Sequence, residues 1–154
     1  MLEVICGSIY LFDEAGRFVP PGEVRKDASP ESKSARSKIL IVDDEKLIAD
    51  TISEILENAG FEVAVAYDGW QAIEMVAKFK PDQLLTDVRM PRMNGVELAI
   101  AIRKMHPAVR ILLFSAHVGF SETLEDAKRQ GFHFELLPKP LRPSELIMRL
   151  RDQP

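Results

Sequence analysis

The stretch KILIVDDE, residues 38–45, places an apolar run directly before three acids. The run from Ile39 to Val42 is continuous rather than alternating, which is typical of a strand buried on both faces of a sheet. Asp43, Asp44 and Glu45 follow at once, and neighbouring carboxylates repel one another and are costly to bury without a positive partner. The stretch therefore predicts a buried strand that leads either into a solvated acidic loop or into a site for a positive group.

Strands alternate with helices from Lys38 onward. After the first strand, apolar residues at helical spacing predict a helix that Gly60 terminates, and four more strand and helix pairs follow. The expected strands are residues 38–42, 61–66, 83–87, 110–116 and 134–139, and the expected helices are residues 48–59, 70–80, 95–105, 121–131 and 143–151. Strict alternation predicts an α/β fold, a doubly wound (βα)5 parallel five-stranded sheet between two helix layers.

Ligands of such sheets bind at the carboxyl ends of the strands. Four of the five expected strands end in a polar or charged residue: Asp43 and Asp44 after the first, then Asp87, Ser115 and Lys139. A hard cation such as Mg²⁺ would relieve the repulsion within a carboxylate cluster, because it prefers oxygen ligands. Lys139 suits a phosphate oxygen, Ser115 supplies a hydroxyl donor, and a carboxylate such as Asp87 can form an aspartyl-phosphate. The strand ends therefore predict a site for Mg²⁺ and a phosphoryl group.

Four segments, ILIVDDE, LLTDVRMPRMNG, LLFSA and LLPKP, resemble in this order the receiver domain of two-component response regulators, the CheY-like family. The resemblance covers roughly residues 38–152 and implies a flavodoxin-like fold with strand order 2-1-3-4-5. It implies that Asp87 accepts a phosphoryl group in a Mg²⁺-dependent reaction. The donor would be a sensor histidine kinase, a phosphotransfer protein or a small phosphodonor.

The resemblance also assigns the metal ligands. Asp44 would bind Mg²⁺ directly, Asp43 would help partly through water, and Asp87 would complete the carboxylate set. The backbone carbonyl of Arg89 would be a further ligand.

Further roles concern the phosphoryl group and the loops around it. Ser115 would hydrogen-bond the phosphoryl group and shift towards it, and Lys139 would pair with one of its oxygens. Pro91 and Gly95 would shape the loop after Asp87. The peptide between Lys139 and Pro140 is often cis in the family.

Two positions bear on how the switch works. Arg89 and His117 would set the lifetime of the phosphorylated state by shielding or orienting the attacking water. Three residues before Lys139, the family usually carries an aromatic residue whose rotation reports phosphorylation, and this chain has Leu136. The nearest aromatic residues are Phe132 and Phe134, so the usual aromatic half of the switch is in doubt.

Three functions remain open. The first is a phosphorylatable signalling switch that is not an enzyme acting on a separate substrate, although its own phosphorylation and dephosphorylation are self-catalysed. The second is a receiver-like interaction scaffold that works without phosphorylation, which Leu136 favours. The third is a phosphotransfer enzyme with an aspartyl intermediate, which would need a larger cap for its substrate.

Composition limits the partners and the location. The net charge of −4 gives no electrostatic reason for nucleic acid binding, and the single Cys6 can form neither an intrachain disulfide nor a metal cluster. No apolar run approaches the roughly 18 residues of a membrane helix. We therefore expect a cytoplasmic protein, a monomer or weak dimer, that signals through a downstream protein partner.

The chain is expected to have two parts. Residues 1–37 form an N-terminal extension, with a possible hairpin over 7–20 and a linker over 20–37 that is rich in Pro, Ser and charge. Residues 38–154 form the receiver domain. Only DQP follows the last expected helix, so we expect a stand-alone receiver whose output face includes residues 117–135.

Overall fold

The computed structural model describes residues 36–116, 122–140 and 142–152 with their side chains, and residue 121 and three N-terminal strands as backbone. The chain divides into two compact units, residues 1–35 and 36–154. In the first unit, β1 (Leu2–Ile5), β2 (Ser8–Phe12) and β3 (Phe18–Val19) form an antiparallel sheet in that order. The pairing of β2 with β3 falls within the stretch where the sequence suggests a hairpin. The expected linker lies outside the described residues except for Arg36 and Ser37.

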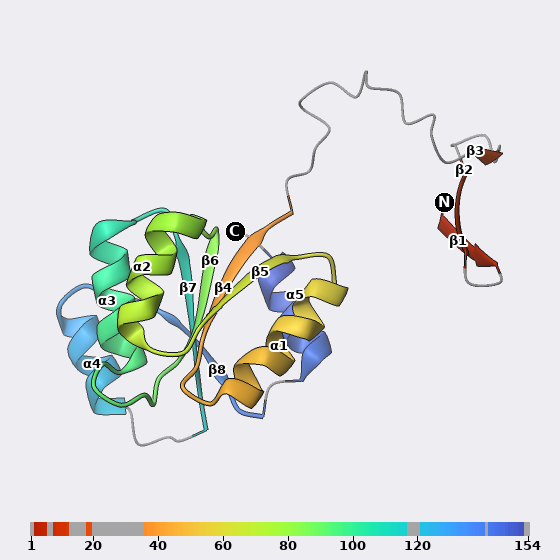
Figure 1. Ribbon diagram of the computed structural model, residues 1–154. Coiled ribbons are helices and arrows are strands. Elements are labelled where there is room, and N and C mark those ends of the chain that lie inside the picture. Colours follow the sequence, from red (N-terminus) through yellow and green to blue (C-terminus); the bar gives the residue numbers. More distant parts are fainter. Residues whose placement is uncertain are drawn as a thin grey trace. The chain divides into compact units, whose positions relative to one another are not determined.

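The second unit is a parallel five-stranded sheet covered by helices on both faces (Figure 1). The strand order is β5-β4-β6-β7-β8, which confirms both the predicted fold class and the order 2-1-3-4-5. The strands are β4 (Lys38–Val42), β5 (Glu62–Ala66), β6 (Gln83–Asp87), β7 (Arg110–Ser115) and β8 (Glu135–Pro138). The helices are α1 (Lys46–Asn58), α2 (Gly69–Phe79), α3 (Gly95–Met105), α4 (Ser121–Arg129) and α5 (Pro143–Arg151).

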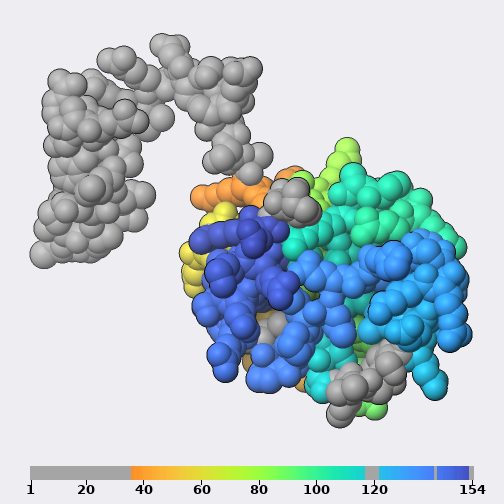
Figure 2. Space-filling model, turned by 180° about the vertical axis from the view of Figure 1, so that it is seen from behind, coloured from red at the N-terminus to blue at the C-terminus, as the bar shows by residue number. Residues whose placement is uncertain are grey.

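The two helix layers follow from the alternation of side chains along the strands. Leu40 and Val42 of β4 pack with α2, α3 and α4, whereas Ile39 and Ile41 pack with α1 and α5. Because both faces are covered, β6 is buried along its whole length, including its polar residues Gln83, Thr86 and Asp87. Figure 2 shows α4 and α5 together on the rear surface of this unit.

Side-chain caps start two helices close to the carboxyl edge of the sheet. Asp68 accepts a hydrogen bond from the Gln71 amide at 2.7 Å at the start of α2. Asn94 and Glu97 form a reciprocal capping box at the start of α3, with distances of 2.8 and 3.1 Å. These caps satisfy helix amides that would otherwise lack partners, and so fix where each helix leaves its loop.

Two strand side chains hold the far end of α5. The Gln83 amide donates to the Leu150 carbonyl at 2.8 Å. Arg110 donates to the carbonyls of Arg149 and Asp152 at 2.8 and 3.0 Å, and its guanidinium also pairs with Glu135 at 2.7 Å. These carbonyls would otherwise be unpaired at a helix end, so the contacts fasten α5 to the amino edge of the sheet.

Gly95 allows α3 to begin directly against the end of β6. Its amide donates to the Val88 carbonyl at 2.8 Å. A Cβ atom at this position would overlap the backbone carbonyl of Asp87, so any other residue must displace the chain around Asp87.

Gly95→Ala should therefore lower the stability of the fold more than the same substitution at a glycine that has a positive φ but open space around it. Gly131, with φ +90 and open space around it, provides the matched control. We expect a loss of about 3 kcal/mol for Gly95→Ala, because the backbone must shift, and about 1 kcal/mol for Gly131→Ala. Urea unfolding measures both values. Equal losses in the two variants would contradict the close approach at Gly95.

Candidate functional site at the carboxyl edge of the sheet

Three carboxylates converge where β4 and β6 end. Asp43 and Asp44 follow β4, and Asp87 is the last residue of β6, the strand paired with β4. One oxygen of each carboxylate lies within 4.8 Å of the others. Asp43 and Asp87 are buried, whereas Asp44 is exposed. The topology thus brings together acids that lie more than forty residues apart in the sequence.

Lys139 places an ammonium group beside these acids. Its Nζ lies 3.5 Å from Oδ2 of Asp87 and 3.9 Å from Oδ2 of Asp43. The Lys139 amide donates to the Ser115 carbonyl at 3.0 Å, which ties the end of β8 to the end of β7. The peptide between Lys139 and Pro140 is cis, as the resemblance implies.

Burial changes how the acids hold protons. The pKa of Asp43 is raised to about 6, chiefly by burial and also by the Asp87 charge, while the Glu45 amide and Lys139 act in the opposite direction. Burial also raises the pKa of Asp87, while Lys139 and the Arg89 amide lower it. The folded, metal-free site therefore holds protons more tightly than these acids do in water.

One oxygen of Asp43 accepts a hydrogen bond, and the other has, within the described part of the chain, only the longer ion pair with Lys139. Asp43 Oδ1 accepts from the Glu45 amide at 2.9 Å. Asp43 Oδ2 is buried and has no hydrogen-bond partner among the described residues. A buried carboxylate oxygen without a hydrogen bond is costly, and a directly bound metal ion would lower that cost. The donor set, all carboxylate oxygen, fits Mg²⁺.

Asp44, Asp87 and Lys139 border an open pocket of about 560 Å³. It is lined by Asp44, Glu45, Asp87, Arg89, Met90, Pro91, Ser115, Ala116 and Lys139. Every predicted site residue except the buried Asp43 thus lines one cavity. The Arg89 amide donates to Oδ1 of Asp87 at 3.3 Å, which orients the carboxylate. The pocket is large enough to admit a phosphoryl group.

Other predicted positions lie elsewhere. His117 is outside the described residues. Leu136 lies on β8 with 47% of its surface exposed. Phe132 and Phe134 precede β8 and stack on each other at 6.3 Å, and Arg103 and Lys104 of α3 lie over their rings. These aromatic residues are therefore packed at the opposite edge of the sheet from Asp87 and do not replace a switch residue at position 136.

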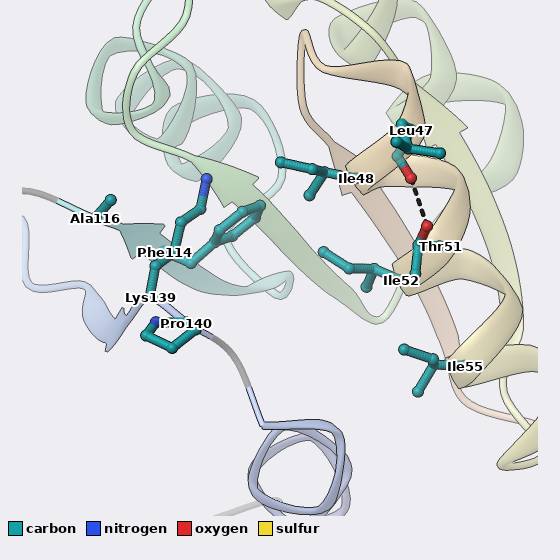
Figure 3. Close-up of a pocket in the computed structure, with 9 residues that line it drawn as sticks. All are labelled: Leu47, Ile48, Thr51, Ile52, Ile55, Phe114, Ala116, Lys139 and Pro140. Atoms are coloured by element: carbon teal, nitrogen blue, oxygen red, sulfur yellow. Dashed lines mark hydrogen bonds between the residues drawn. The ribbon is translucent and has the colours of Figure 1, made fainter.

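A second cavity adjoins the pocket and was not expected from the sequence. It is an apolar groove of about 570 Å³ (Figure 3), lined by Leu47, Ile48, Thr51, Ile52, Ile55, Phe114, Ala116, Lys139 and Pro140. Ala116 and Lys139 border both cavities. Leu47 is 81% exposed at its rim. In the sequence, the groove is indicated only by Leu47, an apolar residue in the first helical turn after the acids. Such a residue is equally compatible with packing in the core.

Comparison with known proteins agrees with this fold. The model of the response regulator receiver domain matches residues 39–151. A response regulator receiver protein of Anaeromyxobacter sp. is 41% identical over 104 residues, which are 68% of this chain and 43% of that protein. The response regulator MprA of Mycobacterium ulcerans is 35% identical over 116 residues, covering 74% of this chain and 48% of MprA. This chain thus spans less than half the length of these curated relatives.

Solved structures also place the chain among the response regulators. The chemotaxis protein CheY4 of Vibrio cholerae superposes with a TM-score of 0.69 and 33% identity, over 76% of this chain and 98% of that one. The chain therefore belongs to the response regulator receiver domains and so to two-component signalling. Within the described part of the chain, no helix is both long enough and apolar enough to cross a membrane.

The raised pKa of Asp43 makes stability depend on pH and metal. An acid whose pKa is higher in the folded state binds its proton more tightly there, so its contribution to stability falls as pH rises from about 4 to about 6. At neutral pH without metal, the ionised Asp43 should cost about 2–3 kcal/mol. Mg²⁺ needs the ionised form and should stabilise the protein more at pH 7.5 than at pH 5.

Asp43→Asn tests this account by thermal unfolding with and without Mg²⁺. At neutral pH we expect the metal-free variant to melt several degrees above the metal-free parent and to gain little from Mg²⁺. Glu45→Gln serves as the control. It changes a neighbouring pocket residue but keeps the backbone N–H from which Asp43 accepts its hydrogen bond. An Asp43→Asn protein with the parent's melting temperature and the parent's response to Mg²⁺ would contradict the assignment.

Proposed function

We propose that this chain is a phosphorylatable switch in which Asp87 accepts a phosphoryl group from a histidine kinase or phosphotransfer protein, with Mg²⁺ required. The observation that carries the proposal is the pairing of the Asp87 carboxylate with the Lys139 ammonium at 3.5 Å in the pocket, next to a buried Asp43 oxygen that has no hydrogen-bond partner among the described residues. A cytoplasmic location fits this role. The chain would transfer a phosphoryl group to itself and would not turn over a separate substrate.

The transfer follows from the residues of the pocket. An Asp87 oxygen attacks phosphorus, an O–P bond forms, and the bond to the donor's imidazole nitrogen or carboxylate oxygen breaks, so the leaving group keeps that electron pair. Lys139 pairs with a phosphoryl oxygen, and Ser115 supplies a hydroxyl at the pocket wall. Bound Mg²⁺ would supply positive charge between the carboxylates and the phosphoryl group. Asp43, Asp44 and Asp87 would hold it, with the Arg89 carbonyl as a further ligand.

The protein phosphodonor would dock in the apolar groove beside the pocket. A donor that carries its phosphoryl group on a side chain must approach Asp87 closely enough to cover the surface next to it. The groove is continuous with the pocket through Ala116 and Lys139, and its rim exposes Leu47. Burying that side chain would favour binding. The groove therefore offers the apolar contact and the position that such a donor requires.

A second function remains a candidate because of Leu136. An exposed leucine on β8 lacks the aromatic ring through which relatives report phosphorylation. The exposed Met148 on α5 adds a further apolar side chain, and α4 and α5 share this side of the molecule (Figure 2). In the scaffold function, a downstream partner would bind the surface that includes Leu136 and Met148, whether or not Asp87 is phosphorylated.

Phosphorylation itself is tested by intact mass after incubation with acetyl phosphate and Mg²⁺. The parent should gain the mass of one phosphoryl group, and Asp87→Asn should gain none, because its amide is a poor nucleophile. Chelation of the metal should abolish the gain. If the parent binds Mg²⁺ and still gains no mass, the switch is excluded and the scaffold is favoured.

Donor docking is tested by Leu47→Gln, since Leu47 is exposed and glutamine suits a helix. Phosphotransfer from a phosphorylated histidine kinase that acts on the parent should slow about ten-fold, as expected for an apolar contact of about this size. Phosphorylation by acetyl phosphate should not change. Met148→Gln, which alters an equally apolar exposed side chain outside the groove, should leave both rates unchanged. Equal kinase rates for parent and Leu47→Gln would exclude docking in the groove.

A further inference from the structure

Phe114 lies where the elements that build the pocket meet. It is fully buried in β7, directly before Ser115. Its backbone carbonyl accepts from the amide of Val88, the residue after Asp87, at 3.1 Å. Its ring lies against Lys139, whose Nζ is 4.7 Å from the ring centroid. Phe114 thus contacts the segment after Asp87 through its backbone and Lys139 through its ring.

The two acids attract the Lys139 ammonium across distances longer than a short hydrogen bond. Its distances of 3.5 and 3.9 Å to the two carboxylates exceed the roughly 2.7–2.9 Å of a charge-assisted hydrogen bond. An aromatic face attracts a cation through its quadrupole, and the attraction grows where water is excluded. The Phe114 side chain is fully buried, and the Lys139 side chain is only 20% exposed. The ring therefore adds a buried contact to the two ion pairs that hold this ammonium.

We propose that Phe114 is a positioning residue: its ring holds the Lys139 ammonium where it meets the phosphoryl group transferred to Asp87. Figure 3 shows the Lys139 side chain running beside the Phe114 ring. The inference rests on the proposed function, because it concerns the reaction at Asp87. A leucine or methionine would fill the space without the quadrupole, so the ammonium would sample more positions and the transfer would slow.

Phe114 also belongs to the core beneath α1 and α5, so its replacement costs stability as well. Leu112 provides a matched control. It lies on the same strand and in the same buried cluster, two positions further from the pocket. If weaker core packing alone lowers the rate of phosphorylation, Leu112→Val should lower it as well as a Phe114 variant.

The experiment compares the full chain with Phe114→Leu, Phe114→Met and Leu112→Val. One measurement is the initial rate of phosphorylation by acetyl phosphate with Mg²⁺, and melting temperatures report stability. The other is the NMR signal of the Lys139 Cε protons in protein with ¹³C-labelled lysine, assigned by its loss in Lys139→Met. Protons over a ring face are shifted upfield by its ring current, so this signal reports the contact itself.

We expect the Phe114 variants to react about five-fold more slowly and to lose the upfield shift, while Leu112→Val keeps both the rate and the shift. The role is overturned if a folded Phe114 variant reacts at the parent's rate, if the parent shows no upfield shift, or if Leu112→Val slows equally. A parent that gains no phosphate overturns the proposed function together with this role. A reacting parent with unaffected Phe114 variants overturns the role alone.

Discussion

Two buried carboxylates that share one ammonium group are the constraint on which this domain depends. Asp43 and Asp87 are desolvated at the ends of adjacent strands, and Lys139 faces both. Because charge is costly to bury, the elements that carry these three residues must hold them close together. The strand order meets that requirement: β4 and β6 are neighbours, and β8 is joined to β7 through the Lys139 amide and the Ser115 carbonyl.

The remainder of the sheet compensates for this arrangement. Apolar clusters cover both faces of β4 and β6, and the buried polar side chains of Gln83 and Thr86 form hydrogen bonds. The repulsion between Asp43 and Asp87 lies at one edge of the sheet, where loops follow the strands. Domains that place function at strand ends can tolerate such an edge, because the stabilising contacts lie in the sheet and helices behind it.

The fold and the position of most site residues could be predicted because, in an α/β fold, the order of the elements determines where the strand ends lie. Alternating strands and helices define a parallel sheet, and its carboxyl ends must share one edge, so Asp43, Asp87 and Lys139 could be placed together from the sequence. The contact between Phe114 and Lys139 was not predictable, since a phenylalanine in an apolar strand is ordinary core. The exposure of Leu47 and the packing of Phe132 on α3 likewise depend on helix rotation and rotamers, which residue spacing does not determine.

The fastening of α5 has a mechanical consequence. Arg110 and Gln83 bind its last carbonyls at one end, and a short connection from Lys139 leads to Pro143 at the other. The helix is about 13 Å long, fixed at the edge away from the pocket and linked at the edge beside it. A displacement of the chain at Lys139 would therefore act on the N-terminal end of α5, whereas the hydrogen bonds from Gln83 and Arg110 hold its C-terminal end in place.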